Sequence, residues 1–453
     1  MQRFTRSGNT EEVSRRAAFA AVAGASLLGC ANSLIGRESP TWEQVHSQLV
    51  PYEGLSSWEK PASSLSGRVV CGYQGWFTTA VDGAEKGWAH YQRNGRFEPG
   101  CCSIDLWPDV SELTADERFD TSFRKADGTV AQVFSSHHSR TVARHFAWMR
   151  DYGIDGAFVQ RFAVETRSPL AQRHCNKVLD HCRAAANSTG RAYALMYDLS
   201  GLAAGQTQDV ISDWKRLVQC MHLGRDAKDR AYLRVKGRPL VAVWGIGFND
   251  KRAYSLDECR SLLRFLRDDS EYGGCTIMVG VPTFWRTLER DSVDDPRLHE
   301  LLLDADIISP WSVGRFGSEH AAAEHGRRVW RPDIQWCRDH DKDYLPVAFP
   351  GFSWSNLRPG SPLGQIPRNK GRFLWSQYIA AREAGLDQMY QAMFDELDEA
   401  TAIFKVDQHP PVGASRFVAE PELPSDHYLW LTGQGGRLLR REIDAAPMPP
   451  SRS

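Results

Sequence analysis

Four acidic side chains stand close together late in the chain, at Asp395, Glu396, Asp398 and Glu399, directly after an apolar run. Cleavage of a glycosidic bond usually needs two carboxyl groups, one that protonates the leaving oxygen and one that acts as base or nucleophile. If the segment begins a helical turn, Glu396 and Glu399 lie on one face of it. Crowded carboxylates raise one another's pKa, so one of them can stay protonated near neutral pH. The spacing therefore fits an acid/base pair.

Two other interpretations of this acidic segment stay open. The macrodipole favours acidic residues at a helix N-terminus, so the segment could start a helix without doing chemistry. Clustered carboxylates also bind calcium, which takes oxygen ligands. Nothing else predicts a bound metal or cofactor, because no Cys-x-x-Cys pair or Cys/His cluster has zinc spacing. A Gly-x-Gly-x-x-Gly fingerprint after a strand and a Walker A sequence are likewise absent from the sequence.

Short apolar runs, each followed by a helical pattern, are the elements that would position these carboxylates. Eight runs are candidate strands, at residues 69–76, 155–160, 192–197, 240–244, 276–281, 306–309, 344–349 and 388–394. A capping box at Ser255 and Glu258 marks the start of one intervening helix. Alternating strands and helices indicate an α/β fold with a parallel sheet. Eight repeats favour a single catalytic domain with the (β/α)8 TIM-barrel fold over an open doubly wound sheet.

The residues that follow barrel strands line the active face of a TIM barrel. Here these positions carry aromatic rings, hydrogen-bonding groups and carboxylates, a composition typical of carbohydrate sites. The candidate substrate-binding residues are Tyr73, Gln74, Trp76, His90, Asp105, Asp198, Trp244, Trp311 and Trp354. Asp198 could orient a sugar hydroxyl, serve as an alternative acid or cap a turn. The aromatic rings could equally plug the barrel mouth or pack in the core.

The acidic segment reads Asp-Glu-Leu-Asp-Glu-Ala-Thr over residues 395–401. It resembles the Asn-Glu-Trp-His-Glu-Gly-Thr motif after the last strand of the family 99 endo-α-mannosidases, which belong to the glycoside hydrolase family 71 and 99 group. Residues 73–76, 82–90, 350–352 and 369–373 are also similar to that group. The similarity covers roughly residues 67–410 and implies a (β/α)8 barrel. The chain looks closer to a bacterial branch that is labelled xylosidase or arabinosidase.

This resemblance implies a role for each glutamate. Glu396 would be the base that activates the sugar 2-hydroxyl and gives a 1,2-anhydro intermediate. Glu399 would protonate the leaving oxygen and then activate water. The Trp-His pair of the motif is replaced by Leu397 and Asp398, and its Gly by Ala400, so mannose specificity is not implied. The expected protein is a retaining glycosidase for an α-linked polysaccharide or glycan; the alternative is a non-catalytic carbohydrate-binding protein on the same barrel.

Composition excludes several other classes of protein. The 55 basic and 56 acidic side chains give a net charge of −1, so there is no general electrostatic footprint for nucleic acid or an anionic membrane surface. The 42% hydrophobic and 25% charged residues are ordinary for a globular protein and exclude disordered and fibrous classes. No repeat of 20–50 residues is present, which excludes solenoids and propellers.

Residues 1–30 are predicted to be an export signal. Arg15 and Arg16 precede an apolar run over residues 17–28, which is too short to span a bilayer as a stable helix. The paired arginines resemble a twin-arginine signal. The Leu-Leu-Gly-Cys sequence ending at Cys30 resembles a bacterial lipobox, in which Cys30 would carry lipid; a plain signal peptide is the alternative. A periplasmic or cell-surface lipoprotein is therefore expected, with this anchor as its one membrane contact.

The remaining boundaries follow from composition. Residues 31–66 are predicted to be a linker and N-terminal wrap, and residues 67–410 the glycosidase-like barrel. Residues 411–453 are predicted to be an extension, with a short strand-like piece at 428–431 and a helix at 436–443. Nine cysteines remain besides Cys30, an odd number, and most are predicted to be unpaired and buried.

Overall fold

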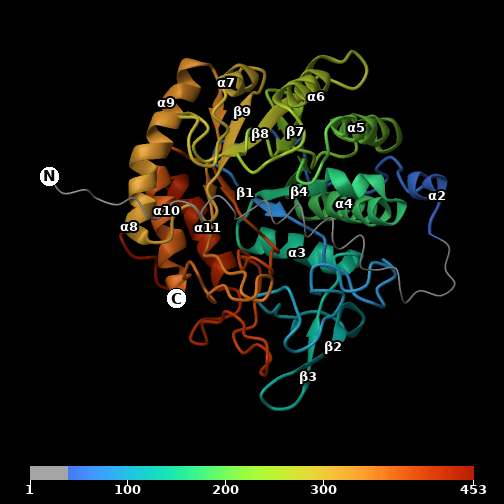
Figure 1. Ribbon diagram of the computed structural model, residues 1–453, viewed down its shortest axis with the longest axis vertical. Helices are drawn as coiled ribbons and strands as arrows, with labels where there is room; N and C mark the ends of the chain where they lie inside the picture. The colour runs from blue at the N-terminus through green and yellow to red at the C-terminus, as the bar shows by residue number, and fades with distance from the viewer. Residues whose placement is uncertain (1–38, 453) are drawn as a thin grey trace.

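The computed structural model describes residues 39–452, and a mostly parallel, curled sheet runs through its centre (Figure 1). The barrel strands are β1 (Val69–Tyr73), β4 (Gly156–Phe162), β5 (Ala192–Asp198), β7 (Arg238–Trp244), β8 (Thr276–Pro282), β9 (Ile307–Trp311), β10 (Asp343–Tyr344), β11 (Val347–Ala348) and β12 (Met389–Gln391). All eight predicted strands are present, the seventh as the pair β10 and β11.

The seventh strand closes the barrel although it is interrupted. β10 pairs with β9, and β11 pairs with β12, so the segment from residue 343 to 348 joins the two sides of the sheet. Pro346 has no N–H to donate, which explains the break between the two pieces. Its carbonyl still accepts a hydrogen bond from the Tyr390 N–H at 2.9 Å, and the Leu345 N–H donates to the Ile308 carbonyl at 3.0 Å. The predicted (β/α)8 barrel is confirmed.

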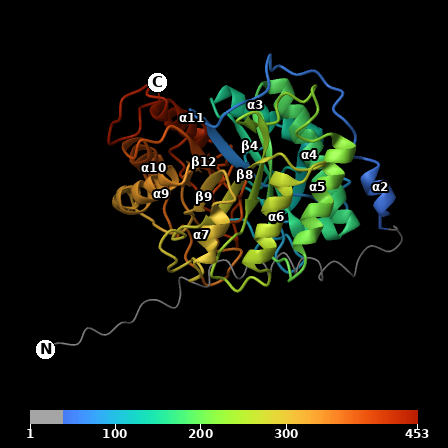
Figure 2. The same ribbon diagram turned by 90° about the horizontal axis from the view of Figure 1, so that it is seen from above.

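Helices surround the strands, as the view from above shows (Figure 2). They are α3 (Ser139–Asp151), α4 (Pro169–Thr189), α5 (Thr207–Met221), α6 (Leu256–Asp268), α7 (Arg297–Leu302), α8 (Glu319–His325), α9 (Arg331–Asp339), α10 (Arg372–Glu383) and α11 (His427–Leu439). The predicted capping box is present at the start of α6, where the Ser255 hydroxyl accepts the Glu258 N–H at 3.2 Å.

Smaller elements lie between and outside these layers. They are α2 (Trp42–His46), β2 (Phe119–Arg124), β3 (Val130–Val133), β6 (Arg234–Val235), η1 (Ala115–Glu117), η2 (Ala163–Arg167), η3 (Gly326–Trp330) and η4 (Asn369–Gly371). β2 and β3 form an antiparallel ribbon that projects away from the barrel (Figure 1). α2 lies on the outside of the barrel beside α4 and α5 (Figures 1 and 2).

Alternation along the strands separates two apolar layers. On β5, Ala194 and Met196 belong to the cluster inside the barrel, whereas Tyr193, Leu195 and Tyr197 pack with the surrounding helices. This follows from the two-residue period of a strand, which sends successive side chains to opposite faces. Position parity at the end of each strand therefore decides which side chains reach the barrel mouth.

The C-terminal segment differs from its prediction. α11 is one continuous helix, so the strand-like piece expected at residues 428–431 is wrong. Its glycines allow close packing instead of breaking the helix: a Cβ at Gly433 would lie 1.9 Å from the Tyr152 carbonyl oxygen, and one at Gly435 would lie 2.5 Å from the Tyr378 ring. Tertiary packing thus outweighs the low intrinsic helix propensity of this segment.

The nine cysteines among the described residues are all free, and most are buried, as predicted. Cys30 and the predicted export signal lie outside the described residues. Between residues 39 and 452, no helix has the length and apolar character needed to cross a membrane.

Candidate active site

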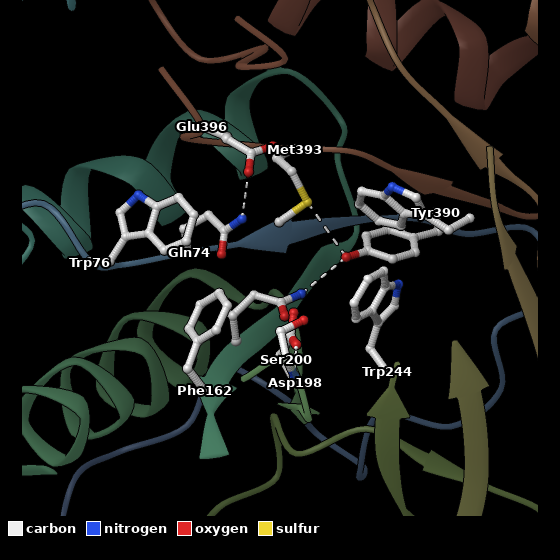
Figure 3. A pocket seen from close by; sticks show the side chains of 11 residues that line it. Gln74, Trp76, Phe162, Asp198, Ser200, Trp244, Tyr390, Met393 and Glu396 are labelled. Carbon is white, nitrogen blue, oxygen red and sulfur yellow. Dashed lines mark hydrogen bonds between the residues drawn. The ribbon is translucent and has the colours of Figure 1, made fainter. Parts of the chain in front are cut away.

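A cavity with about 440 Å³ of empty volume, part of it open to solvent, lies at the carboxyl ends of the barrel strands (Figure 3). Its lining residues are Gln74, Trp76, Gln160, Phe162, Asp198, Ser200, Trp244, Trp311, Tyr390, Met393 and Glu396. Trp76 and Phe162 face Trp244 and Tyr390 across the cavity, and Glu396 and Asp198 lie at opposite ends of it. Flat apolar walls with a few convergent polar groups suit a ring with an apolar face and hydroxyl edges.

Glu396 is buried and held in one orientation at the edge of this cavity. Gln74 donates from Nε2 to Glu396 Oε1 at 2.9 Å, and the Thr401 hydroxyl donates to Oε2 at 2.6 Å. Within residues 39–452, the Gln74 side-chain oxygen has no hydrogen-bond partner of its own. Gln74 therefore both positions the Glu396 carboxylate and leaves an acceptor for a hydroxyl in the cavity.

Asp395 ties the last strand to the first. Its carboxyl oxygens accept the Gln74 N–H at 2.7 Å and the Gly75 N–H at 2.9 Å. Burial raises the pKa of Asp395 to about 7, against the opposite effect of these two hydrogen bonds. Gly75 has a φ of 61°, in the region that favours glycine. The turn that carries Gln74 and Trp76 into the cavity is thus anchored by a carboxyl group beside Glu396.

This burial makes the stability of the fold depend on pH. Between about pH 4 and 7, Asp395 is ionised in the unfolded chain and protonated in the folded one, so the free energy of unfolding falls as the pH rises. An Asp395→Asn variant has no titratable carboxyl group at this position. We expect the stability of the wild type relative to this variant to fall by about 3 kcal/mol from pH 5 to pH 8. Urea unfolding at both pH values measures the difference.

The Asp151→Asn substitution, which removes one exposed carboxyl group, is the matched control for the effect of pH on the rest of the chain. A constant difference for Asp395→Asn would show that Asp395 is ionised in the folded protein at pH 5.

Asp398 and His90 support one wall of the cavity from behind. His90 Nδ1 lies 3.4 Å from Asp398 Oδ2, and the other Asp398 oxygen is buried without a hydrogen-bond partner in the described part of the chain. The His90 ring stacks on Trp76 with centroids 3.7 Å apart, and Trp76 stacks in turn on Phe162 at 5.2 Å. His90, predicted to contact substrate, thus lies behind the ring that lines the cavity.

Glu399 is buried but does not appear among the lining residues. Its carbonyl accepts the Ser353 N–H at 2.9 Å, in the loop after β11. Burial lowers the pKa of Arg358, and the negative charge of Glu399 opposes this shift, which places Glu399 near that guanidinium. Arg358 in turn lies over the Trp354 ring at 4.7 Å. The predicted acid therefore lies beside this loop.

The acidic segment is a turn rather than the start of a helix, so both helical interpretations of residues 395–399 are wrong. The chain doubles back after β12: the Met393 N–H donates to the Thr401 carbonyl at 3.2 Å, and the Ile403 N–H donates to the Met393 carbonyl at 3.0 Å. Ala400, with a φ of 53°, lies at the bend. These backbone pairs use the groups that a helix would need. In the described residues no cluster of three or more His, Cys, Asp or Glu side chains is arranged to hold a metal.

Three more predicted residues line the cavity directly, namely Asp198, Trp244 and Trp311. Asp198 Oδ1 accepts the Ser200 N–H at 2.7 Å, so this carboxylate also closes the turn after β5. The Trp244 and Trp311 rings meet edge to face, with centroids 5.6 Å apart and an interplanar angle of 80°. The Arg252 guanidinium lies over the Trp244 ring, 5.1 Å from its centroid.

Tyr73, Asp105 and Trp354 lie away from the cavity lining. Tyr73 is fully buried between the sheet and α3, where its hydroxyl bonds to His145 Nδ1 at 2.9 Å. Asp105 accepts hydrogen bonds from the Ser353 hydroxyl and from two backbone N–H groups of residues 355 and 356, at 2.6 and 2.8 Å. Its carboxylate thereby holds the loop after β11. The buried Trp354 ring packs against Phe352 with centroids 5.1 Å apart.

Five lining residues were not among the candidates: Gln160, Phe162, Ser200, Tyr390 and Met393. The Tyr390 hydroxyl accepts a hydrogen bond from Gln160 Nε2 at 3.1 Å, which links β12 to β4, the two strands that flank β1 (Figure 3). Strand parity could have identified most of them, because Gln160 and Phe162 share the inward face of Phe158 on β4. A Cβ at Gly72 would lie 2.1 Å from the Met393 methyl carbon, so a glycine on β1 makes room for Met393.

Comparison with solved structures shows that this barrel is similar to two structures of a glycosidase. The GH99 endo-α-mannosidase from Bacteroides thetaiotaomicron superposes with a TM-score of 0.60 at 16% identity, over 83% of this chain and 99% of that chain. A structure of that enzyme in complex with bis-Tris propane gives a TM-score of 0.58, with the same identity and coverage. No protein-family model and no curated protein matches the sequence. The expected resemblance to the family 71 and 99 group is confirmed for the fold.

Proposed function

We propose that this protein is a glycoside hydrolase that cleaves an α-linked polysaccharide or glycan with retention of configuration. The observation that carries the proposal is the Glu396 carboxylate, which Gln74 and Thr401 hold at the edge of an aromatic cavity at the barrel mouth. A second buried glutamate, Glu399, follows three residues later. The fold is that of a GH99 endo-α-mannosidase, whose activity lends further support.

The proposed reaction has two steps. In the first, Glu396 takes the proton of the sugar 2-hydroxyl while the oxygen of that hydroxyl bonds to the anomeric carbon. The bond to the leaving oxygen breaks, and Glu399 gives that oxygen its proton. In the second, Glu399 takes a proton from water as the water oxygen attacks the anomeric carbon. The 1,2-anhydro ring opens, and its oxygen recovers the proton from Glu396. Two inversions at the anomeric carbon give net retention.

A second candidate function is a carbohydrate-binding protein without turnover. It is favoured by the position of Glu399, which lies by the loop after β11 and not among the residues that line the cavity. Asp198 is the other carboxylate at the cavity and is the alternative source of the proton for the leaving oxygen.

The test is a hydrolysis screen of the mature protein, with Cys30 replaced, on α-mannan, α-glucan, arabinan and xylan. Product sizes and anomeric configuration are followed by NMR. We expect one polysaccharide to release oligosaccharides whose new reducing ends retain the α configuration. Binding of a polysaccharide with no release from any of them would support the binding protein instead, and products of inverted configuration would overturn the two-step reaction.

We also propose that the protein is exported and anchored by lipid at Cys30. The paired arginines and the Leu-Leu-Gly-Cys sequence support this location. Radiolabelled palmitate should enter the wild type and not a Cys30→Ser variant; equal labelling of both would contradict the anchor.

A further inference from the structure

A second cavity lies outside the catalytic one, on the flank where α2 rests against the barrel. It has about 750 Å³ of empty volume, part of it open to solvent. We call it the α2–α5 groove, and its main lining residues are Trp42, His46, Arg167, Asp209, Ser212 and Arg216. They come from α2, η2 and α5, three elements that the proposed reaction does not use.

The groove presents a flat aromatic platform to solvent. The side chain of Trp42 is 41% exposed, unusual for so large a ring, and it stacks on His46 with centroids 5.6 Å apart and an interplanar angle of 27°. An indole of this kind can pack against the apolar face of a sugar ring. His46 lines the groove beside this ring. The stack therefore provides an aromatic platform at the edge of the groove.

The other lining residues provide groups that suit hydroxyls. Ser212 can donate or accept, and the Arg216 guanidinium is a donor. Arg167 is paired with Asp209 at 3.1 Å, and Asp213 beneath them with Arg161 at 2.6 Å. Among the charged lining residues that the structure describes, Arg216 alone has no such ion pair. One uncompensated cation is too little for a polyanion such as a nucleic acid, which needs many phosphate contacts.

The groove and the catalytic cavity share a rim of the barrel. Phe162 lines the cavity at the end of β4, and the chain runs directly through η2 to Arg167, which lines the groove. A 3-10 helix rises about 2 Å per residue, so the two positions are roughly 10 Å apart. From there Asp209, Ser212 and Arg216 lie on successive turns of one face of α5 and lead away from the rim. A chain of a few sugar units can reach from one site to the other.

We propose that the α2–α5 groove is a second carbohydrate-binding site, which holds a neutral polysaccharide chain while another part of the chain lies in the catalytic cavity. The identity of the ligand rests on the proposed function. The groove would raise affinity for polymers and leave the reaction of a single sugar unit unchanged.

The experiment is affinity electrophoresis of the mature protein in gels that contain soluble α-mannan, pullulan, arabinan or xylan. The variants are Trp42→Ala and Arg216→Ala in the groove, Trp76→Ala in the catalytic cavity, and Leu55→Ala as a control at an exposed apolar residue outside both. We expect Trp42→Ala to weaken retardation by one polysaccharide roughly tenfold, with a smaller effect of Arg216→Ala and none of Leu55→Ala. The kcat/KM of Trp42→Ala on a small aryl glycoside should equal that of the wild type.

The outcomes separate this inference from the proposed function. Retardation that depends on Trp42, together with no hydrolysis of any polysaccharide, would support the groove and contradict the enzyme. Hydrolysis together with equal retardation of the wild type and Trp42→Ala would support the enzyme and overturn the groove. Retardation lost only in Trp76→Ala, or no retardation in any of the four gels, would also overturn the groove.

Discussion

Replacing Glu399 by glutamine is expected to lower turnover of a natural glycan by about 10²- to 10⁴-fold, the range that a positioned general acid contributes. Glutamine has nearly the same shape but no proton to give to the leaving oxygen. The loss should depend on the leaving group, because a dinitrophenolate departs without protonation. With a dinitrophenyl glycoside we expect a burst of phenolate followed by slow turnover, since Glu399 also activates water in the second step. Stopped-flow absorbance measures both phases.

A matched control for Glu399→Gln is Glu422→Gln, at an exposed glutamate that pairs with Lys370 on the surface. It should turn over like the wild type. Unchanged activity of Glu399→Gln on the natural glycan would contradict the assigned role. Asp198→Asn would then be the decisive variant, because Asp198 is the other carboxylate at the cavity.

Replacing Glu396 by glutamine is expected to lower turnover about 10³-fold or more for every leaving group, because the amide cannot take the proton of the sugar 2-hydroxyl. The side chain keeps its size, so Gln74 and Thr401 should still enclose it. Rates on a series of aryl glycosides with leaving groups of different pKa measure the effect. No burst should appear with the dinitrophenyl glycoside, in contrast to Glu399→Gln.

A substrate without the 2-hydroxyl gives the complementary control. The wild type should not turn over a 2-deoxy aryl glycoside faster than the Glu396→Gln variant does. A wild type that cleaves it rapidly would show that the 2-hydroxyl takes no part. The reaction would then proceed through a bond between a carboxylate and the anomeric carbon.

The amino-acid sequence was sufficient to predict the barrel fold and many of the residues that line the cavity at its mouth. Each strand is an apolar run bounded by a helical pattern, and burial of these runs on both faces requires a parallel sheet with helices around it. Gln74, Trp76, Asp198, Trp244, Trp311 and Glu396 follow or end such runs, and all six line the cavity. Asp198, Trp244 and Trp311 end their strands, so local periodicity determines their positions and they can be predicted without knowledge of distant contacts.

Odd or even position along a strand explains why only one of two neighbouring predictions on β1 is right. Tyr73 and Gln74 are neighbours at the end of β1, yet Tyr73 packs outward against α3 and Gln74 lines the cavity. The two-residue period of β1 contains this information, since Val70 faces the barrel interior and Gln74 has the same parity. Tyr390 on β12 could have been identified in the same way.

Only the tertiary structure shows which distant groups the loop residues contact. Asp105 bonds to a loop some 250 residues later in the chain, and His90 reaches Asp398 across 308 residues. The acidic segment folds back as a turn because its backbone pairs with residues 401–403, which no local pattern signals. The sequence by itself determined which residue types reach the barrel mouth. For the residues in the loops, long-range hydrogen bonds between distant parts of the chain determined which side chains face the cavity and which hold it together.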